Sequence, residues 1–366
     1  MHGLEKPPTR PDFPATPDMS AVMAASQLVT GHLAGAMSSL LVVVGLRCGI
    51  FAALAASGPT SSTDLAHRCG LDERHLREWL AAMTQAGYLR TDPSGSRFSL
   101  DPALAGLLTD QRSPMDLTPG YRLFHAMAGM VEPVAAALRG TGRVAPDAYP
   151  DEFYVAMEAM SAGWLNGLLV QAWLPGIDGL VDRLSAGGRM ADIGCGGGVA
   201  MVALARAFPK CEIVGFDRHG PNVRRARAAA RSAGVAGRVR VVEGDAVREL
   251  SGPYDLITAF SVLHDVAEPV ALLRRARQAL ADDGVLLVLE SAADPAPGGG
   301  GNPFATILYA TSVLYCLPTS RNDGGGSGTL GLPGERLRRL GLDAGFTSVT
   351  PLPTMNPFNE LHYLRA

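Results

Sequence analysis

Five short apolar runs in the second half of the chain restrict the folds that it can adopt. Stretches rich in alanine, leucine and arginine separate most of these runs, which read RMADI, EIVGF, RVRVV, YDLITAF and GVLLVLE. This alternation predicts an α/β fold, in which helices cover both faces of a largely parallel sheet. In such sheets ligands bind beyond the carboxyl ends of the strands, so the residues that follow each run are candidates for a binding site.

The first apolar run leads directly into a glycine-rich loop. The segment Met190 to Ala200 reads MADIGCGGGVA, with four glycines among five consecutive residues. Glycine allows the positive φ values of a sharp turn from strand to helix, and its missing side chain lets a bulky ligand approach the backbone. The free N–H groups where the helix begins suit an anion. A dinucleotide fingerprint would need a third glycine at Val199, so a nicotinamide oxidoreductase is disfavoured.

Acidic residues recur at the ends of the next runs. The first run holds Asp192, the second ends in Asp217 after 25 positions, and Asp245 follows the third after another 28. Together with the alternating glycines after Asp192, this order resembles the class I S-adenosylmethionine-dependent methyltransferases. The resemblance implies a Rossmann-like sheet of seven strands, mostly parallel. It also implies a terminal antiparallel hairpin, for which FTSVTPL and ELHYLRA are the candidate strands.

The resemblance also implies a cofactor and the residues that hold it. The cofactor is S-adenosyl-L-methionine, and S-adenosyl-L-homocysteine is the product. In the family the second acidic residue accepts the ribose hydroxyl protons, and the third faces the adenine amino group, with the next backbone N–H beside it. The cofactor-binding residues expected here are Asp192, Gly194, Cys195, Gly196, Gly198, Asp217, Arg218, Gly244, Asp245, Ala246, Phe260 and Ser261.

A second motif concerns the base that removes a proton from the acceptor. SVLHDV, which contains His264, resembles the Leu-His-Asp element of small-molecule O-methyltransferases from plants and bacteria, whose histidine is the general base. It also resembles uncharacterised actinobacterial-type methyltransferases. Val266 stands where the family usually has tryptophan. His264 is therefore the candidate base, although a histidine here could instead cap the next helix or line the cofactor pocket. Glu158, alone among apolar neighbours, is a second candidate.

Two further segments are expected to build the acceptor pocket. Asp151 to Trp173 is an apolar helix before the catalytic domain, and Asn302 to Pro318 is inserted after the fifth strand, where this fold commonly carries a lid. Glycine-rich stretches, Pro295 to Pro303 and Arg321 to Gly334, flank the insertion and could act as its hinges. A hydrophobic or aromatic acceptor follows, methylated on oxygen or carbon. The substrate-binding residues expected are Tyr154, Met157, His264, Tyr309 and Cys316.

The first half of the chain has a different pattern. Two helical stretches, TSSTDLAHRCG and DERHLREWLAAMTQAG, precede a short hairpin formed by YLRT and RFSL, an order that is typical of a winged helix. Charges on the second helix nearly cancel, whereas a helix that reads a DNA groove carries clustered positive charge. We therefore expect a dimerisation module, as in the O-methyltransferase family. A transcriptional regulator that binds S-adenosylmethionine or another ligand without turnover is the alternative.

These patterns divide the chain into four parts. We expect a disordered tail at 1–20, a winged-helix domain at 21–110, substrate-lining helices at 111–177 and a catalytic domain at 178–366, whose lid insertion covers 295–333. The apolar run Leu33 to Leu46 stops at Arg47, so we expect a buried helix rather than a membrane span.

The composition limits the kinds of partner and ligand that the chain is expected to bind. The net charge of −3 gives no general attraction to nucleic acid, and the five cysteines form no CxxC pair. The eight histidines are dispersed, so no metal site is expected. The first twenty residues lack the apolar segment of an export signal, which favours the cytoplasm. We expect a homodimer that binds a small-molecule substrate. Neither nucleic acid nor a membrane is expected as a partner.

Overall fold

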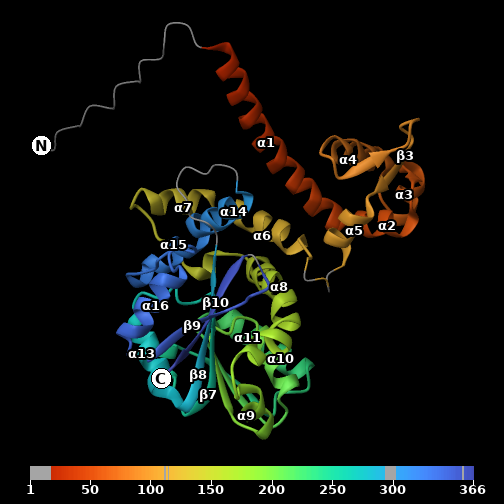
Figure 1. Cartoon of the computed structure of the whole chain (residues 1–366). Coiled ribbons are helices and arrows are strands. Elements are labelled where there is room, and N and C mark those ends of the chain that lie inside the picture. Colours follow the sequence, from red (N-terminus) through yellow and green to blue (C-terminus); the bar gives the residue numbers. More distant parts are fainter. Residues whose placement is uncertain (1–17, 111–112, 114, 293–301, 357) are drawn as a thin grey trace, which may run out of the picture. The chain divides into compact units, whose positions relative to one another are not determined.

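The computed structural model describes residues 18–110, 113, 115–292, 302–356 and 358–366 (Figure 1). The chain divides into two compact units, Met1–Ala105 and Gly106–Ala366. Most of the tail expected at 1–20 lies outside the described residues, and the first helix begins at Met19. Of the two expected hinges, most of Pro295 to Pro303 also lies outside them.

The N-terminal unit is a winged helix, as the sequence predicts. Its helices are α1 (Met19–Arg47), α2 (Ile50–Ser57), α3 (Ser62–Cys69) and α4 (Glu73–Gln85). Strands β1 (Thr60–Ser61), β2 (Leu89–Thr91) and β3 (Arg97–Leu100) pair antiparallel in the order β1-β3-β2. The Ser61 and Asp72 side chains cap α3 and α4 by accepting backbone N–H groups, which satisfies donors that would otherwise lack partners.

Helix α1 differs from the buried helix that we expected. It runs for 29 residues, and only Val42, Val43 and Gly45 are buried, whereas Leu33 is 63% exposed and Leu40 is 38% exposed. By length and composition alone it could cross a membrane, a criterion that core helices and signal sequences also meet. The prediction of a buried helix is wrong for a single chain, because the rest of this unit covers only the C-terminal end of α1. Its apolar surface needs another explanation.

The C-terminal unit contains the predicted seven-stranded sheet. Its strands are β4 (Arg189–Ile193), β5 (Glu212–Asp217), β6 (Val239–Glu243), β7 (Tyr254–Phe260), β8 (Leu280–Ser291), β9 (Ser348–Leu352) and β10 (Asn359–Arg365). They lie in the order β6-β5-β4-β7-β8-β10-β9. The first five are parallel, and β10 runs antiparallel to both β8 and β9, which confirms the terminal hairpin. Strand order reverses at β4, so the glycine loop that follows β4 lies at the topological switch point.

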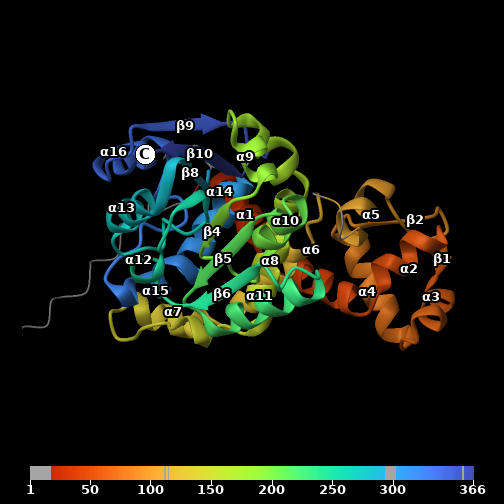
Figure 2. The same ribbon diagram turned by 90° about the horizontal axis from the view of Figure 1, so that it is seen from below.

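Helices bury both faces of this sheet, which is why its strands are almost continuously apolar (Figure 2). One face packs against α9 (Leu180–Ala186), α10 (Val199–Ala207) and α11 (Gly220–Ser232). The other packs against α12 (Ala246–Glu249), α13 (Pro269–Ala279) and α16 (Gly334–Asp343). Successive residues of a strand alternate between the two cores: Met190 belongs to the first and Ala191 to the second.

Additional helices precede the sheet in the chain or are inserted after β8. Those before the sheet are α5 (Pro102–Thr109), α6 (Thr118–Ala128), α7 (Val131–Leu138), η1 (Pro146–Ala148), α8 (Asp151–Gly167), η2 (Leu169–Trp173) and η3 (Leu174–Gly176). Those inserted after β8 are α14 (Pro303–Thr311), η4 (Ser312–Cys316), α15 (Leu317–Ser320) and η5 (Arg321–Asp323). Helices α6, α7 and α8 share an apolar core, and Leu314 and Tyr315 of the insertion pack against it. The insertion is therefore attached to the helices that precede the sheet.

Candidate active site

The glycine loop after β4 has the backbone that its sequence requires. Gly194, Gly196 and Gly198 have φ values of +66°, +52° and +88°, in the left-handed region that favours glycine. A Cβ on Gly194 would overlap the Val262 side chain, and a Cβ on Gly197 would overlap the Glu158 carboxylate. A Cβ on Gly196 would meet nothing within 4 Å. The loop is thus enclosed at two positions and open at a third, where a ligand can reach bare backbone.

Asp192 supports this loop from within the sheet. Its side chain is buried, and its Oδ1 accepts a hydrogen bond of 2.6 Å from the Thr258 hydroxyl on β7. Burial raises the pKa of Asp192 to about 7, and the charge of Asp217 adds to the rise, while the Thr258 hydrogen bond opposes it. Asp192 therefore joins β4 to β7 directly beneath the loop, and a direct contact of its side chain with the cofactor stays a prediction.

Asp217 connects the loop after β5 to the glycine loop. Its Oδ2 accepts from the Gly196 N–H at 2.9 Å, and its Oδ1 accepts from the His219 N–H at 2.8 Å. The Asn222 amide lies 3.3 Å from both oxygens. These donors fix the carboxylate at the carboxyl end of β5, beside the open face of Gly196, where the sequence places the residue that holds the ribose.

The other expected cofactor residues surround the same end of the sheet. Asp245 caps α12 by accepting the Val247 N–H at 2.9 Å, and Gly244 donates its N–H to the Asp217 carbonyl at 3.0 Å. Ser261 has a φ of +54°, which is rare outside glycine and concentrates at functional sites. The structure buries Cys195 and Ala246, half-buries Phe260 and exposes Arg218.

His264 lies just beyond β7 and forms a buried pair with Glu290 near the end of β8. The His264 Nδ1 and the Glu290 Oε2 are 2.5 Å apart, and the Glu290 Oε1 accepts the Leu263 N–H at 2.8 Å. His264 is 3% exposed and Glu290 is 2% exposed. Burial alone would lower the pKa of His264, but the negative charges of Glu290 and Asp265 and two hydrogen bonds outweigh it and raise that pKa well above its usual range.

The sequence analysis missed Glu290. It is the final residue of the run GVLLVLE, where a single carboxylate ends an otherwise apolar run. A buried carboxylate needs donors, and the neighbouring parallel strand ends at the Leu-His-Asp motif, so these two facts together could have indicated the pair. The adjacent Asp265 does not take this role: its Oδ1 is 3.5 Å from the His264 Nε2.

Glu158, the second candidate base, has another partner. Its Oε1 accepts from the Arg225 Nε at 2.9 Å and from the Arg225 Nη2 at 2.7 Å, and Arg225 also donates to Asn222 at 2.5 Å. The carboxylate lies against Gly197, as described above. This places Glu158 over the glycine loop on the cofactor side, with its charge balanced by an arginine, which disfavours a role as acceptor base.

Aromatic side chains link α8 to the insertion. The Tyr315 ring centroid lies 4.4 Å from that of Phe153 and 5.0 Å from that of Tyr149, and the Tyr149 hydroxyl donates to the Leu314 carbonyl at 2.5 Å. The Tyr154 ring packs at a tilt against that of His219, two residues after Asp217, with the ring centroids 4.3 Å apart. The aromatic cluster therefore extends from the insertion to the predicted ribose site.

The expected substrate residues are distributed unevenly around this cluster. Tyr154 belongs to it, and Met157 packs against the same core. Cys316 is buried next to His264, whereas Tyr309 is 47% exposed on α14. The second glycine-rich stretch contacts the site: the Ser327 N–H donates to the His264 carbonyl at 2.7 Å, and the Thr329 hydroxyl donates to the Cys316 sulfur at 3.0 Å.

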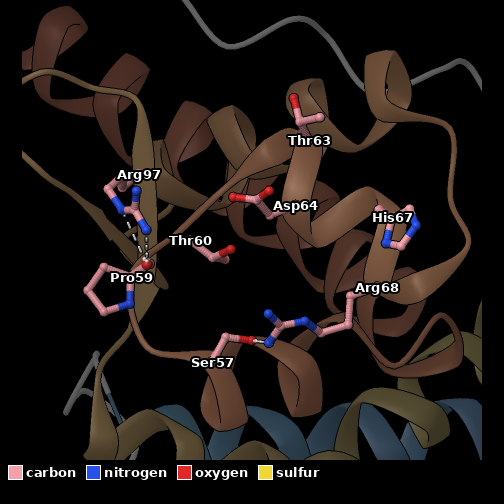
Figure 3. Close-up of a pocket in the computed structure, with 8 residues that line it drawn as sticks. All are labelled: Ser57, Pro59, Thr60, Thr63, Asp64, His67, Arg68 and Arg97. Carbon is pink, nitrogen blue, oxygen red and sulfur yellow. Dashed lines mark hydrogen bonds between the residues drawn. The ribbon is translucent and has the colours of Figure 1, made fainter.

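The winged-helix unit has a hollow of its own, which Figure 3 shows. Arg97 donates to the Pro59 carbonyl at 3.1 Å, and Arg68 donates to the Ser57 hydroxyl. Both guanidinium groups are therefore hydrogen-bonded to oxygen atoms of the same unit. The basic residues of α4 pair with acidic ones: Arg74 with Glu78 and Arg77 with Glu73, each at 2.5 Å. The helix therefore presents no clustered positive charge for a DNA groove.

Comparison with known protein families gives two matches. Residues 191–286 match a methyltransferase domain, and residues 36–110 match the Rv2258c-like winged HTH domain. Acetylserotonin O-methyltransferase from Mus musculus is 32% identical over 300 residues, which are 76% of this chain and 76% of that protein.

Solved structures share the fold across nearly the whole chain. Human N-acetylserotonin methyltransferase, in complex with SAM, is 19% identical with a TM-score of 0.60, and the match covers 96% of this chain and 99% of that one. CalO1, a methyltransferase in calicheamicin biosynthesis in its SAH-bound form, is 23% identical with a TM-score of 0.65 and covers 96% and 100%.

Proposed function

The chain belongs to the S-adenosylmethionine-dependent O-methyltransferases that carry an N-terminal winged-helix domain, and from this premise we propose that it methylates a hydroxyl group of a small aromatic metabolite. The observation that carries the proposal is the buried pair of His264 and Glu290, which supplies a base at the carboxyl edge of the sheet. Similarity to acetylserotonin O-methyltransferase, whose name specifies an oxygen acceptor, favours oxygen over carbon.

The residues beyond β4, β5 and β6 suit S-adenosylmethionine. Gly196 offers bare backbone beside open space, Asp217 offers a carboxylate to the ribose hydroxyls, and Asp245 and Ala246 lie where the adenine ring is expected. Tyr154 and Glu158 on α8 lie against this region. When bound, the donor supplies an electrophilic sulfonium methyl group, so the protein mainly has to align the acceptor with it.

The base acts on the acceptor hydroxyl. His264 would take the proton of this hydroxyl on Nε2, because Nδ1 is held by Glu290. Glu290 fixes this tautomer and stabilises the imidazolium that forms, and the Leu263 N–H fixes Glu290 in turn. With the donor bound, transfer of its methyl group would give the methyl ether of the acceptor and S-adenosyl-L-homocysteine, and His264 would hold the released proton.

Aromatic and sulfur-containing side chains favour an aromatic acceptor. Tyr154, Met157, Tyr315 and Cys316 come from α8 and from the insertion, which lies outside the basic sheet-and-helix unit. Such side chains present apolar surface with few polar atoms, as ligand pockets usually do. The insertion acts as a lid, with Arg321 to Gly334 as the described hinge.

Methyl transfer from labelled S-adenosylmethionine to a panel of phenolic acceptors tests the proposal. His264→Ala should reduce turnover by about 10²–10⁴-fold, the usual contribution of a general base, while calorimetry shows unchanged affinity for S-adenosylhomocysteine. His67→Ala, which removes an exposed histidine from the winged helix, is the matched control. Full activity in His264→Ala would refute the base, and salt-sensitive DNA retention without turnover would favour the regulator.

The apolar surface of α1 also belongs to this proposal. We infer that the chain forms a homodimer in the cytoplasm and that the partner subunit covers this helix. Large apolar side chains are exposed along the whole helix, and five of them follow one stripe at intervals of seven and four residues: Val22, Val29, Leu33, Leu40 and Val44. The others are Met19, Met23, Leu28 and Met37, of which Met23 and Leu28 lie on other sides of the helix. A partner helix would bury this stripe.

A further inference from the structure

Three potential metal ligands converge beside the catalytic histidine. One ligand atom from each of His264, Asp265 and Cys316 lies within 4.8 Å of the other two. Fifty-one positions separate Asp265 from Cys316, so the sequence gives no metal-binding spacing, and we expected no metal site. Among the residues that the structure describes, no other group of three histidine, cysteine, aspartate or glutamate side chains has this geometry.

These three ligand atoms interact mainly with one another and have few partners outside the group. The Nδ1 of His264 is taken by Glu290, so Nε2 is the nitrogen that faces the group, 3.5 Å from the Asp265 Oδ1. That oxygen is buried without a hydrogen-bond partner, which is costly for a carboxylate. The Cys316 sulfur is buried, accepts a hydrogen bond from Thr329, and also interacts with the side chains of His264 and Asp265.

The surroundings match those of a bound transition metal. A metal-ligating histidine usually donates its other ring N–H to a carboxylate, which orients the ring, and Glu290 is placed to accept that proton. Thiolate, imidazole and carboxylate together are the donors that Zn²⁺ takes in four-coordinate sites. Three protein ligands leave one position open to water.

We propose that His264, Asp265 and Cys316 form a Zn²⁺ site whose occupation reversibly inhibits methyl transfer. Binding releases the Cys316 thiol proton, and the metal takes the Nε2 lone pair that would otherwise accept the proton of the acceptor hydroxyl. Zinc thus competes with the acceptor for the same base. The inhibition rests on the proposed function, whereas the binding site does not.

Cobalt(II) tests the binding without any assay of activity. Titration of the purified full chain with Co²⁺ should produce a thiolate-to-cobalt charge-transfer absorption that saturates at one equivalent, and Zn²⁺ should displace it. Cys316→Ser should abolish this band, whereas Cys48→Ser, which removes an exposed cysteine of the winged helix, should leave it intact. Glu290→Gln should weaken binding by about 10–100-fold. Circular dichroism confirms that each variant is folded.

Inhibition is then measured for each variant relative to its own rate in chelator. Zn²⁺ should suppress methyl transfer by the wild-type chain in step with loss of the cobalt band, and chelator should restore it. Cys316→Ser should lose most of this sensitivity. A wild-type chain without the thiolate band, or equal zinc sensitivity in Cys316→Ser, would overturn the proposal. Saturable cobalt binding without any methyl transfer would refute the proposed function and leave the site standing.

Discussion

The charge of Glu290 sets the pH at which His264 can act. A general base works in its neutral form, so kcat/KM rises with pH through the His264 pKa, which lies well above its usual range. Glu290→Gln removes the nearest negative charge and should lower that pKa. We therefore predict that the acid limb of the kcat/KM profile moves to lower pH in Glu290→Gln, while kcat falls because the ring loses its fixed tautomer.

Asp265→Asn is the matched control for this profile. It removes a carboxylate that is farther from the ring, 3.5 Å from Nε2 against 2.5 Å for Glu290 to Nδ1. Its acid limb should move less than that of Glu290→Gln. An acid limb at the wild-type pH in Glu290→Gln would show that His264 does not limit the reaction.

A second prediction at the scale of the residue concerns Asp192 and the stability of the folded chain. Its pKa in the folded chain is about 7, against about 3.8 when exposed, so the folded state holds a proton that the unfolded state releases. Stability therefore falls as pH rises from about 4 to 7, by up to about 4 kcal/mol, and then levels off. Asp192→Asn should flatten this dependence, which melting temperatures measured from pH 5 to 8 would reveal. An unchanged slope would mean that Asp192 is ionised when buried.

At the scale of the element, a substitution at Gly197 tests how closely α8 packs over the glycine loop. Its φ is not positive, so alanine suits the backbone, but the new Cβ would overlap the Glu158 carboxylate. We predict that Gly197→Ala weakens S-adenosylhomocysteine binding about tenfold, the effect of a shift worth about 1.4 kcal/mol. Combining it with Glu158→Ala should restore part of the affinity, as calorimetry would show. Without this rescue, α8 does not lie over the loop.

The elements that local pattern determines were predicted from the sequence. The glycine loop, the acidic residues Asp217 and Asp245 at or just beyond strand ends, the winged helix and the terminal hairpin each depend on a short segment with a distinct periodicity or turn. Glu290 was not predicted, and Cys316 was predicted only as a member of the same acceptor pocket as His264, because their contacts with His264 depend on how β8 and the insertion pack. Glu158 shows the same limit: Arg225, 67 positions away, determines its role.

At the scale of the whole molecule, α1 has an apolar surface that a single chain leaves exposed. A soluble unit seldom exposes a continuous apolar surface unless a partner covers it. Here the exposed side chains run along nearly the full length of a 29-residue helix, while the winged helix beside it has its own core of α2, α3 and α4 residues. The core and the exposed stripe are therefore separable, so the assembly can be disrupted without unfolding the unit.

We predict that the double substitution Val29→Glu with Leu33→Glu converts a dimer into a monomer. These side chains are 66% and 63% exposed, so glutamate costs little within one chain, but two charges would be buried without partners in the interface. Light scattering coupled to gel filtration measures the mass. Gln27→Glu adds a charge on another side of the same helix and should leave the dimer intact. A wild-type monomer, or a wild-type chain that requires detergent to leave the membrane fraction, would contradict the assignment of this stripe to a partner subunit.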